Sequence, residues 1–314
     1  MSEVGSRVPR LEDPRLLTGA GSFVDDVDRP GQLHLRVVRS TVAHGRILAV
    51  DVASALEMPG VVLARTGAEL CLPPIPVRVS PDPGQLEPYL QPVLARERVR
   101  YVGEPIAVVL AEDPYLAEDA AELVEVIYEG LEPVLEAASA GAPGTPALFE
   151  GSSNEVAELH ASFGDAGAAF EAAHRIVSVD VAVGRQTAVP IETRGLLAEW
   201  SADHLEIWGA TKVPHFNRRV LADMLGIEPS QIRMRRSDAG GGFGVRGELY
   251  PEDVLVALLA REAGRPVKWV EDRAEHLVAA NHSRDQAHVL SGAFSAEGDL
   301  LGLRAEIWHD NGAY

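Results

Sequence analysis

The segment Asp238-Ala239-Gly240-Gly241-Gly242-Phe243-Gly244 places four glycines around one aromatic side chain. Glycine accepts a positive φ and has no Cβ, so such a run is typical of backbone that a ligand approaches closely. Its N–H groups can then point at an anionic or oxo group. The apolar ring predicts a rigid, partly buried loop that presents Phe243 and backbone amides to a ligand. A tight turn with an exposed Phe243 is the alternative.

The same segment matches the dinucleotide-binding fingerprint over residues 242–247, with Glu271 and Asp272 near the spacing of a ribose-binding acid. The context counts against that interpretation. The predicted strand over residues 232–236 alternates apolar and basic residues, whereas a buried parallel strand is apolar throughout. The next helix is predicted to begin only at Pro251, too late for its N-terminus to hold a pyrophosphate. An NAD(P)-binding dehydrogenase domain therefore stays as an alternative.

Composition indicates a globular chain that is long enough for two domains. It has 314 residues, 46% of them hydrophobic, and at this length roughly three quarters of the unfolded surface is buried on folding. A net charge of −19 argues against nucleic acid as a partner. The single cysteine, Cys71, excludes an internal disulfide and a cysteine-ligated iron–sulfur site. No signal peptide or apolar stretch of membrane length is evident, so we expect a cytoplasmic location and no membrane partner.

The first half alternates strands with short helices. Strands are predicted over residues 33–39, 47–52, 61–64, 100–110 and 124–128, and a short helix over 54–58. Asp113 followed by Pro114 is an N-cap signal, and it predicts a helix that buries Ala117 and Ala120. Residues 138–146 are rich in Ala, Gly and Pro, which is typical of a linker. The pattern predicts an α+β unit that ends near residue 140.

The second half is also mixed. Strands are predicted over residues 174–182, 196–200, 205–208, 232–236, 266–270 and 301–307, and helices over 214–225 and 251–263. Residues 254–260 are apolar all round, which predicts a buried helix. The turn signal over residues 310–312 is followed by only Ala313 and Tyr314. We therefore expect an unpaired strand edge and a truncated domain.

Several blocks of sequence resemble one family, and they come in that family's order. The blocks are Arg10–Gly19, Phe23–Asp26, Val102–Val108, Trp208–His215, Asp238–Gly244 and Gly264–Arg273. Together they resemble the N-terminal portion of the large, molybdopterin-binding subunit of the xanthine dehydrogenase, aldehyde oxidase and aerobic carbon monoxide dehydrogenase family. The resemblance implies an α/β hammerhead-like domain over residues 1–140, a linker over 141–154 and the first part of a mixed α+β molybdopterin-binding domain over 155–314.

The resemblance also implies a chemistry. Members oxidise an aldehyde, an N-heterocycle or a similar small carbon centre, with water as the oxygen source. Their molybdenum is held by molybdopterin, here expected in the cytosine dinucleotide form, so no protein ligand cluster is needed. Electrons pass to 2Fe-2S and FAD on an iron–sulfur small subunit and a medium subunit, and a dimer of heterotrimers is expected. The general-base glutamate is expected beyond residue 314, in the remainder of the large subunit. We therefore expect the isolated chain to be inactive. It would be a fragment of the large subunit, one half of a split subunit, or a non-catalytic remnant or assembly module.

Cofactor-binding positions carry over from the matching motifs. They are Lys212, Gly241, Gly242, Phe243 and Gly244. Phe243 matches the family's phenylalanine beside the molybdenum, and its flanking glycines match the amides there. Lys212 stands where glutamine usually approaches the oxo ligand. An ammonium group has three donors, so it could still bind an oxo group, or it could point to solvent.

Substrate-pocket positions follow the same loop. Val245 replaces a common second glycine, and Gly247 falls where purine-oxidising members carry an acid, with Glu248 beside it. Purine specificity is therefore not expected. Glu192 also matches a family position, where a structural hydrogen bond is favoured over catalysis. His276, His282 and His288 are not expected to bind a metal, because the polar spacers between them predict an irregular loop.

Overall fold

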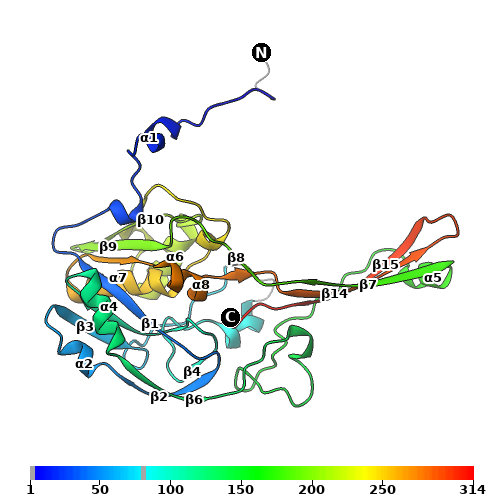
Figure 1. Cartoon of the computed structure of the whole chain (residues 1–314), viewed down its shortest axis with the longest axis horizontal. Coiled ribbons are helices and arrows are strands. Elements are labelled where there is room, and N and C mark those ends of the chain that lie inside the picture. Colours follow the sequence, from blue (N-terminus) through cyan, green and yellow to red (C-terminus); the bar gives the residue numbers. More distant parts are fainter. Residues whose placement is uncertain (1–3, 79–82) are drawn as a thin grey trace.

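The computed structural model describes residues 4–78 and 83–314 (Figure 1). Its main feature is a seven-stranded sheet with the order β11-β10-β9-β12-β1-β5-β3. The strands are β1 (Leu33–Arg39), β3 (Val61–Thr66), β5 (Pro105–Ala111), β9 (Gly195–Ser201), β10 (His204–Gly209), β11 (Ile232–Arg236) and β12 (Val267–Val270). The α+β class and a hammerhead part followed by the start of a cofactor-binding part are confirmed.

The two predicted parts of the chain share this sheet. Strand β1 runs parallel to β12, with Leu33 opposite Val267, and antiparallel to β5. Each of the two parts therefore completes the sheet of the other, although they are far apart in sequence. The boundaries at residues 140 and 155 stay a prediction.

Two long helices of the second part form as predicted. They are α6 (Pro214–Leu225) and α7 (Pro251–Ala263), and α6 ends at Gly226, which has a φ of 65°. Six of the seven residues over 254–260 are buried, so the predicted buried helix is confirmed. Helix α7 packs on β9 and β12 in the main hydrophobic core. This core is the platform that carries the glycine loop at the end of β11.

The first part packs a second layer on the other end of the sheet. Its further elements are α2 (Ala53–Leu56), α4 (Pro114–Glu122) and the three-stranded sheet of β2 (Gly45–Asp51), β4 (Arg98–Val99) and β6 (Glu125–Gly130). Asp113 Oδ1 accepts hydrogen bonds from Tyr115 N at 2.9 Å and Leu116 N at 3.3 Å, which confirms the predicted N-cap. The strand predicted over 100–110 begins only at Pro105. A turn precedes it, in which Gly103 has a φ of 106°.

The segment over residues 141–154 is ordered by contacts. Asn154 Nδ2 donates to Pro146 O at 2.8 Å, and Asn154 Oδ1 accepts from Leu148 N at 2.9 Å. The buried Phe149 ring lies 5.0 Å from the Tyr89 ring. Alanine, glycine and proline here predict the absence of long elements, and the one buried aromatic fixes the path of the chain.

A three-stranded antiparallel sheet projects from this body (Figure 1). It contains β7 (Arg175–Val183), β14 (Gln286–Phe294) and β15 (Leu300–His309), with α5 (Ala166–Glu171) near its far end. The irregular loop expected around residues 282–288 is wrong. His282 belongs to β13 (His282–Ser283), which pairs with β8 (Gln186–Thr187), and His288 belongs to β14. Polar residues are tolerated there because these strands are exposed on at least one face.

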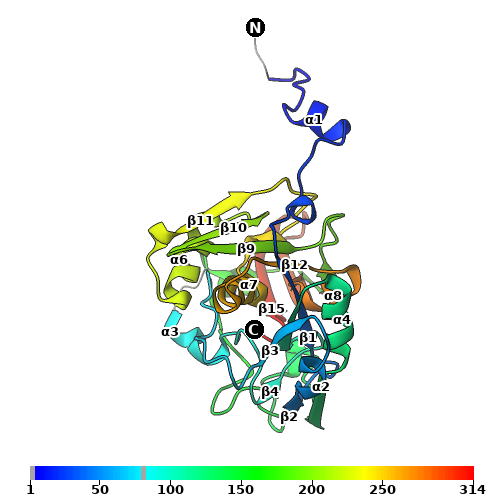
Figure 2. The same cartoon turned by 90° about the vertical axis from the view of Figure 1, so that its left-hand side faces the viewer.

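The remaining elements are short. They are α1 (Asp13–Leu17), η1 (Val24–Asp26), α3 (Pro83–Leu86), η2 (Glu87–Tyr89), η3 (Ala137–Ser139), η4 (Pro229–Gln231), η5 (Val245–Gly247) and α8 (Arg273–Ala279). The N-terminal segment with α1 extends away from the body (Figure 2). Among the residues described, there is no helix whose length and apolar character would let it cross a membrane.

Candidate cofactor-binding site

The glycine run forms a loop between the end of β11 and η5. Gly241 and Gly244 have φ values of 107° and 112°, and Phe243 has a φ of 47°. A non-glycine residue in this left-handed region costs roughly 1 kcal/mol. Backbone strain of this kind persists only where the surroundings fix it, and it is concentrated at ligand sites.

The glycines of the loop differ in what an added side chain would meet at each position. A Cβ on Gly240 would lie 2.4 Å from Glu192 Cβ, so the packing of the chain itself demands glycine there. Gly241 and Gly244 are required by their φ values. Gly242 is different, because the nearest described atom to an added Cβ would be Arg246 Cδ, at 3.9 Å. The fold therefore leaves an open space beside Gly242 that a Cβ would enter.

A buried ion pair holds the loop from below. Arg246 donates to Gly241 O at 2.7 Å and to Thr193 O at 3.1 Å, and it pairs with the Glu192 carboxylate at 2.7 Å. Glu192 Oε2 also accepts from Gly240 N at 2.7 Å. These contacts confirm a structural role for Glu192. Burial lowers the pKa of Arg246, and the Glu192 carboxylate opposes this shift.

The N-terminal segment ties the other end of the loop. Ser22 N donates to Asp238 Oδ2 at 2.7 Å, and Asp238 N donates to Ser22 O at 2.8 Å. Arg15 binds the same carboxylate, with Nη2 donating to Oδ1 at 2.7 Å. The hydrogen bond from Arg15 holds the pKa of Asp238 well below its usual range. These contacts and those of Arg246 and Glu192 fix the loop at Asp238 and at Gly240–Gly241, by partners that the sequence did not indicate.

The Phe243 ring itself is 80% exposed. The predicted partial burial of the loop is met at residues 238 and 240–242, whereas the Phe243 ring within it is exposed, as in the alternative of a tight turn. The glycines around it turn the ring outward, and the left-handed backbone keeps it there. An apolar ring that a constrained loop holds in water is available for contact with a ligand or another polypeptide.

The other predicted site residues lie close behind the loop. Lys212 N donates to Arg246 O at 2.9 Å, and a Cβ on Gly247 would lie 3.7 Å from Lys212 Cδ. The Lys212 side chain is exposed, and over residues 4–78 and 83–314 its ammonium group has no recorded hydrogen bond or ion pair. Val245 is buried. Glu248 forms an ion pair with Arg78 at 3.0 Å, so its carboxylate is already partnered.

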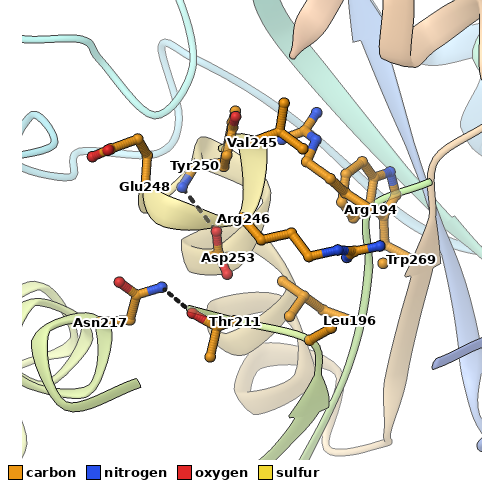
Figure 3. A pocket seen from close by; sticks show the side chains of 12 residues that line it. Arg194, Leu196, Thr211, Asn217, Val245, Arg246, Glu248, Tyr250, Asp253 and Trp269 are labelled. Atoms are coloured by element: carbon orange, nitrogen blue, oxygen red, sulfur yellow. Dashed lines mark hydrogen bonds between the residues drawn. The ribbon is translucent and has the colours of Figure 1, made fainter. Parts of the chain in front are cut away.

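Two cavities lie beside these residues. The smaller, of about 30 Å³, is lined by Val245, Arg246, Glu248, Asn217 and Asp253 among others, and Figure 3 shows them converging between η5, α6 and α7. Burial raises the pKa of Asp253 to about 7. The larger, of about 560 Å³, lies between the two parts of the chain and is also bordered by Glu248. That volume is within the range of small-molecule sites.

A buried ion cluster supports the segment under the loop. Arg194 binds Glu271 and, at 3.3 Å, Glu252, whose other oxygen accepts from Arg39 of β1 at 2.6 Å. His276 Nδ1 lies 2.8 Å from the same Glu271 carboxylate. Glu271 and His276 are therefore partnered within the core, and Asp272, the other candidate for a ribose-binding acid, pairs with Arg36 and accepts from Glu275 N at 2.7 Å. No group of three or more His, Cys, Asp or Glu residues in the described ranges could hold a metal ion.

Glu104 is a buried carboxyl group outside this cluster, and it contacts Tyr314. Tyr314 Oη donates to Glu104 Oε1 at 2.5 Å, and Arg100 N donates to Oε2 at 2.5 Å. Burial raises the pKa of Glu104 to about 7. In the unfolded chain this carboxyl group has a pKa near its ordinary value. Between that pKa and about 7, the folded state therefore binds a proton that the unfolded state has lost.

This difference predicts a pH dependence of stability. As pH rises from about 4.5 to about 7, the contribution of Glu104 to the free energy of unfolding falls, by roughly 3 kcal/mol at most, because only the unfolded state gains ionisation there. Glu104→Gln has no carboxyl group to ionise at this position, so its free energy of unfolding should lack this pH-dependent fall. The stability difference between the variant and the parent chain should therefore shrink as pH rises. Urea unfolding at pH 5 and pH 8 measures it. A pH-independent difference between the two proteins would contradict the prediction.

Comparison with known proteins gives two matches that follow this geometry. Residues 18–132 match the aldehyde oxidase and xanthine dehydrogenase a/b hammerhead domain, and residues 148–314 match the molybdopterin cofactor-binding domain. The chain belongs to the xanthine dehydrogenase and aldehyde oxidase family. Within this family it corresponds to the N-terminal portion of the molybdopterin-binding large subunit, as the sequence motifs implied.

Individual relatives agree with this family assignment. The chain is 42% identical to the 6-hydroxypseudooxynicotine dehydrogenase complex subunit gamma of Paenarthrobacter nicotinovorans, covering 99% of this chain and 40% of that subunit. It is 41% identical to the nicotine 6-hydroxylase large subunit of the same organism, covering 99% and 38%. The solved quinoline 2-oxidoreductase of Pseudomonas putida 86 superposes with a TM-score of 0.84 at 36% identity, over 96% of this chain and 39% of that one. The chain thus spans about two fifths of the length of these relatives.

The molybdopterin family's motifs located the glycine loop and Lys212, but sequence reasoning missed Arg246. Its signal was present as a single basic residue two positions after Phe243-Gly244. It could not be interpreted without the fold, because its partners Glu192 and Thr193 lie more than fifty residues earlier in the chain.

Proposed function

We propose that this chain forms part of the large subunit of a molybdenum hydroxylase. The proposed substrate is an aldehyde, an N-heterocycle or a similar small carbon centre, and N-heterocycles are favoured because relatives are named for nicotine and quinoline. The observation that carries the proposal is the open space at Gly242 on a loop fixed at Asp238 and at Gly240–Gly241. When bound, the molybdenum cofactor would supply a two-electron oxidation of the substrate carbon, with water as the oxygen source.

The residues of this chain would bind and orient that cofactor. Backbone groups at Gly241, Gly242 and Gly244 would face it, because a Cβ at Gly242 would enter the open space. Phe243 would lie against the cofactor or substrate, which would give its exposed ring an apolar contact. Lys212 would supply N–H donors from the exposed side of the loop. The larger cavity, bordered by Glu248, would hold the substrate.

Further parts of the proposal concern the complex. The cofactor is proposed to be the cytosine dinucleotide form of molybdopterin. The remainder of the large subunit would supply the general-base glutamate and further pterin contacts. An iron–sulfur subunit with 2Fe-2S and a medium subunit with FAD would carry the electrons, in a cytoplasmic dimer of heterotrimers. Relatives named as a subunit gamma and a large subunit support a multi-subunit assembly.

An assembly module without catalysis is the second candidate, favoured by the two-fifths coverage of the relatives. The test is co-expression of the chain with the remainder of a related large subunit and with iron–sulfur and flavin subunits. We expect stoichiometric molybdenum, cytosine nucleotide and dye-linked oxidation of an N-heterocycle by the complex, and none by the isolated chain. A stable complex that lacks molybdenum would favour the assembly module, and turnover by the isolated chain would contradict the need for a remainder.

A further inference from the structure

The projecting sheet of β7, β14 and β15 has two unlike faces. Because side chains alternate along a strand, the pairing registers decide which residues share a face. Val179 lies opposite Leu290, and His288 lies between Val181 and Ile307. The resulting valine face contains Val177, Val179, Val181, Leu290, Leu303 and Ile307. The opposite face is mixed, with the polar Ser178, Asp180, Ser291, Arg304 and Glu306 and the apolar Ile176, Val289 and Trp308 at the intervening positions.

Helix α5 covers the opposite face and not the valine face. A Cβ on Gly302 would lie 2.8 Å from Ala169 Cβ, so the backbone of β15 touches the helix closely there. The Arg304 guanidinium lies 4.2 Å from the centre of the Phe170 ring. Both Gly302 and Arg304 belong to the opposite face, because they alternate with Leu303 along β15. The more polar face is thus the one on which α5 packs, at Gly302 and Arg304, while Asp180 and Glu306 of that face stay exposed.

The valine face stays open to water. Val177, Val179 and Val181 are 47%, 50% and 41% exposed, and Leu303 and Ile307 are 58% and 54% exposed. Antiparallel sheets commonly turn one face to water, but that face is then the polar one. Each exposed aliphatic side chain forgoes the stabilisation that burial of its surface would bring. A contiguous exposed apolar surface of this kind marks an interaction site.

We propose that the valine face docks the polypeptide that forms the remainder of the large subunit in the relatives. This inference rests on the proposed function, because it treats the chain as one portion of such a subunit. The matched relatives have about three fifths of their length outside the aligned region, enough to supply a complementary apolar surface. A second copy of this chain is a poorer occupant, because each copy has a net charge of −19 and the two would repel.

The face also specifies what the occupant presents. Its central residues are branched and aliphatic, with His288 between Val181 and Ile307, and Arg175, Gln286 and His309 lie on the same face toward its two ends. Complementary packing therefore requires an apolar stripe on a strand or helix, and charged groups of the occupant would lie at the rim. The remainder of the large subunit would meet these residues as part of its own hydrophobic core.

The test uses matched lysine substitutions on adjacent residues of opposite faces. Val179→Lys and Ile307→Lys place a charge on the valine face, and Asp180→Lys and Glu306→Lys place the same charge on the opposite face. The probe is the part of the nicotine 6-hydroxylase large subunit that follows its region of alignment with this chain, purified without molybdenum. Its binding to the whole chain is measured by titration calorimetry at low micromolar concentration, with light scattering and amide hydrogen exchange in parallel.

We expect Val179→Lys and Ile307→Lys each to raise Kd at least tenfold, and the two control variants to change it less than threefold. Binding should slow hydrogen exchange in β7 and β15. Equal affinity for all four variants, or the absence of a complex, would overturn the proposal. A dimer of this chain that Val179→Lys dissociates would assign the face to a second copy instead. Because binding is measured without molybdenum, failure of cofactor loading in the assembled complex would count against the proposed function alone.

Discussion

Replacing Gly242 by valine is expected to remove most of the molybdenum from the assembled complex, at least tenfold, while the fold of the chain stays intact. A Cβ there would have its nearest described neighbour at 3.9 Å, so the described chain leaves room for the added Cβ. Gly242 is also absent from the positive-φ residues, so a β-branched side chain meets no backbone strain of that kind. Any large effect must therefore come from the ligand that would occupy the space.

Two further glycines separate a ligand effect from a folding effect. Gly130→Val is the matched control, because an added Cβ there has no described neighbour within 4 Å and lies far from the loop in the sequence. It should leave the molybdenum content unchanged. Gly240→Ala should lower both thermal stability and molybdenum content, because its Cβ would collide with Glu192. Metal analysis and thermal unfolding of the three complexes distinguish these patterns. Normal molybdenum content in the Gly242 variant would contradict a role of the loop in cofactor binding and leave it as a turn without a ligand.

Much of the fold could be predicted because its signals are local. The ends of α6 and α7 follow from a proline at each start and a glycine with a left-handed backbone at each end. The N-cap at Asp113 is equally local, since it depends on neighbours within a few residues. The glycine run also predicts a constrained loop from local sequence alone.

The rest depends on contacts between residues far apart in the chain. Arg246 and Glu192 form the support of the loop only because the loop after β11 lies beside the segment before β9, where Glu192 N donates to Gly240 O at 3.2 Å. Pairing of β1 with β12 likewise joins residues more than two hundred positions apart. The sequence also left the exposure of Phe243 open, with an exposed ring as the alternative, because an apolar ring in a constrained loop is compatible with a buried site and with a surface that another polypeptide covers.

Removal of the Arg194 guanidinium, as in Arg194→Ala, is expected to cost about 3–5 kcal/mol of unfolding free energy. Burial by itself would lower the pKa of Arg194, but the carboxylates of Glu252 and Glu271 outweigh it and raise the pKa. Without the guanidinium, both carboxylates lose a partner inside the core. The side chain also lies 3.9 Å above the Tyr250 ring, so its removal opens a cavity as well. Urea unfolding followed by tryptophan fluorescence measures the loss.

The control is Arg235→Ala, which breaks an exposed ion pair with Glu206 at 2.8 Å and should lower the free energy of unfolding far less, because solvent screens that pair. A similar small loss for Arg194→Ala would contradict a structural role for the cluster. The cluster also bears on the cofactor site, because Arg246 donates to Thr193 O, the carbonyl that precedes Arg194. Loosening residue 194 should therefore disturb the support under the glycine loop. In the assembled complex, Arg194→Ala should lower the molybdenum content in parallel with stability, whereas Gly242→Val should lower the molybdenum content alone.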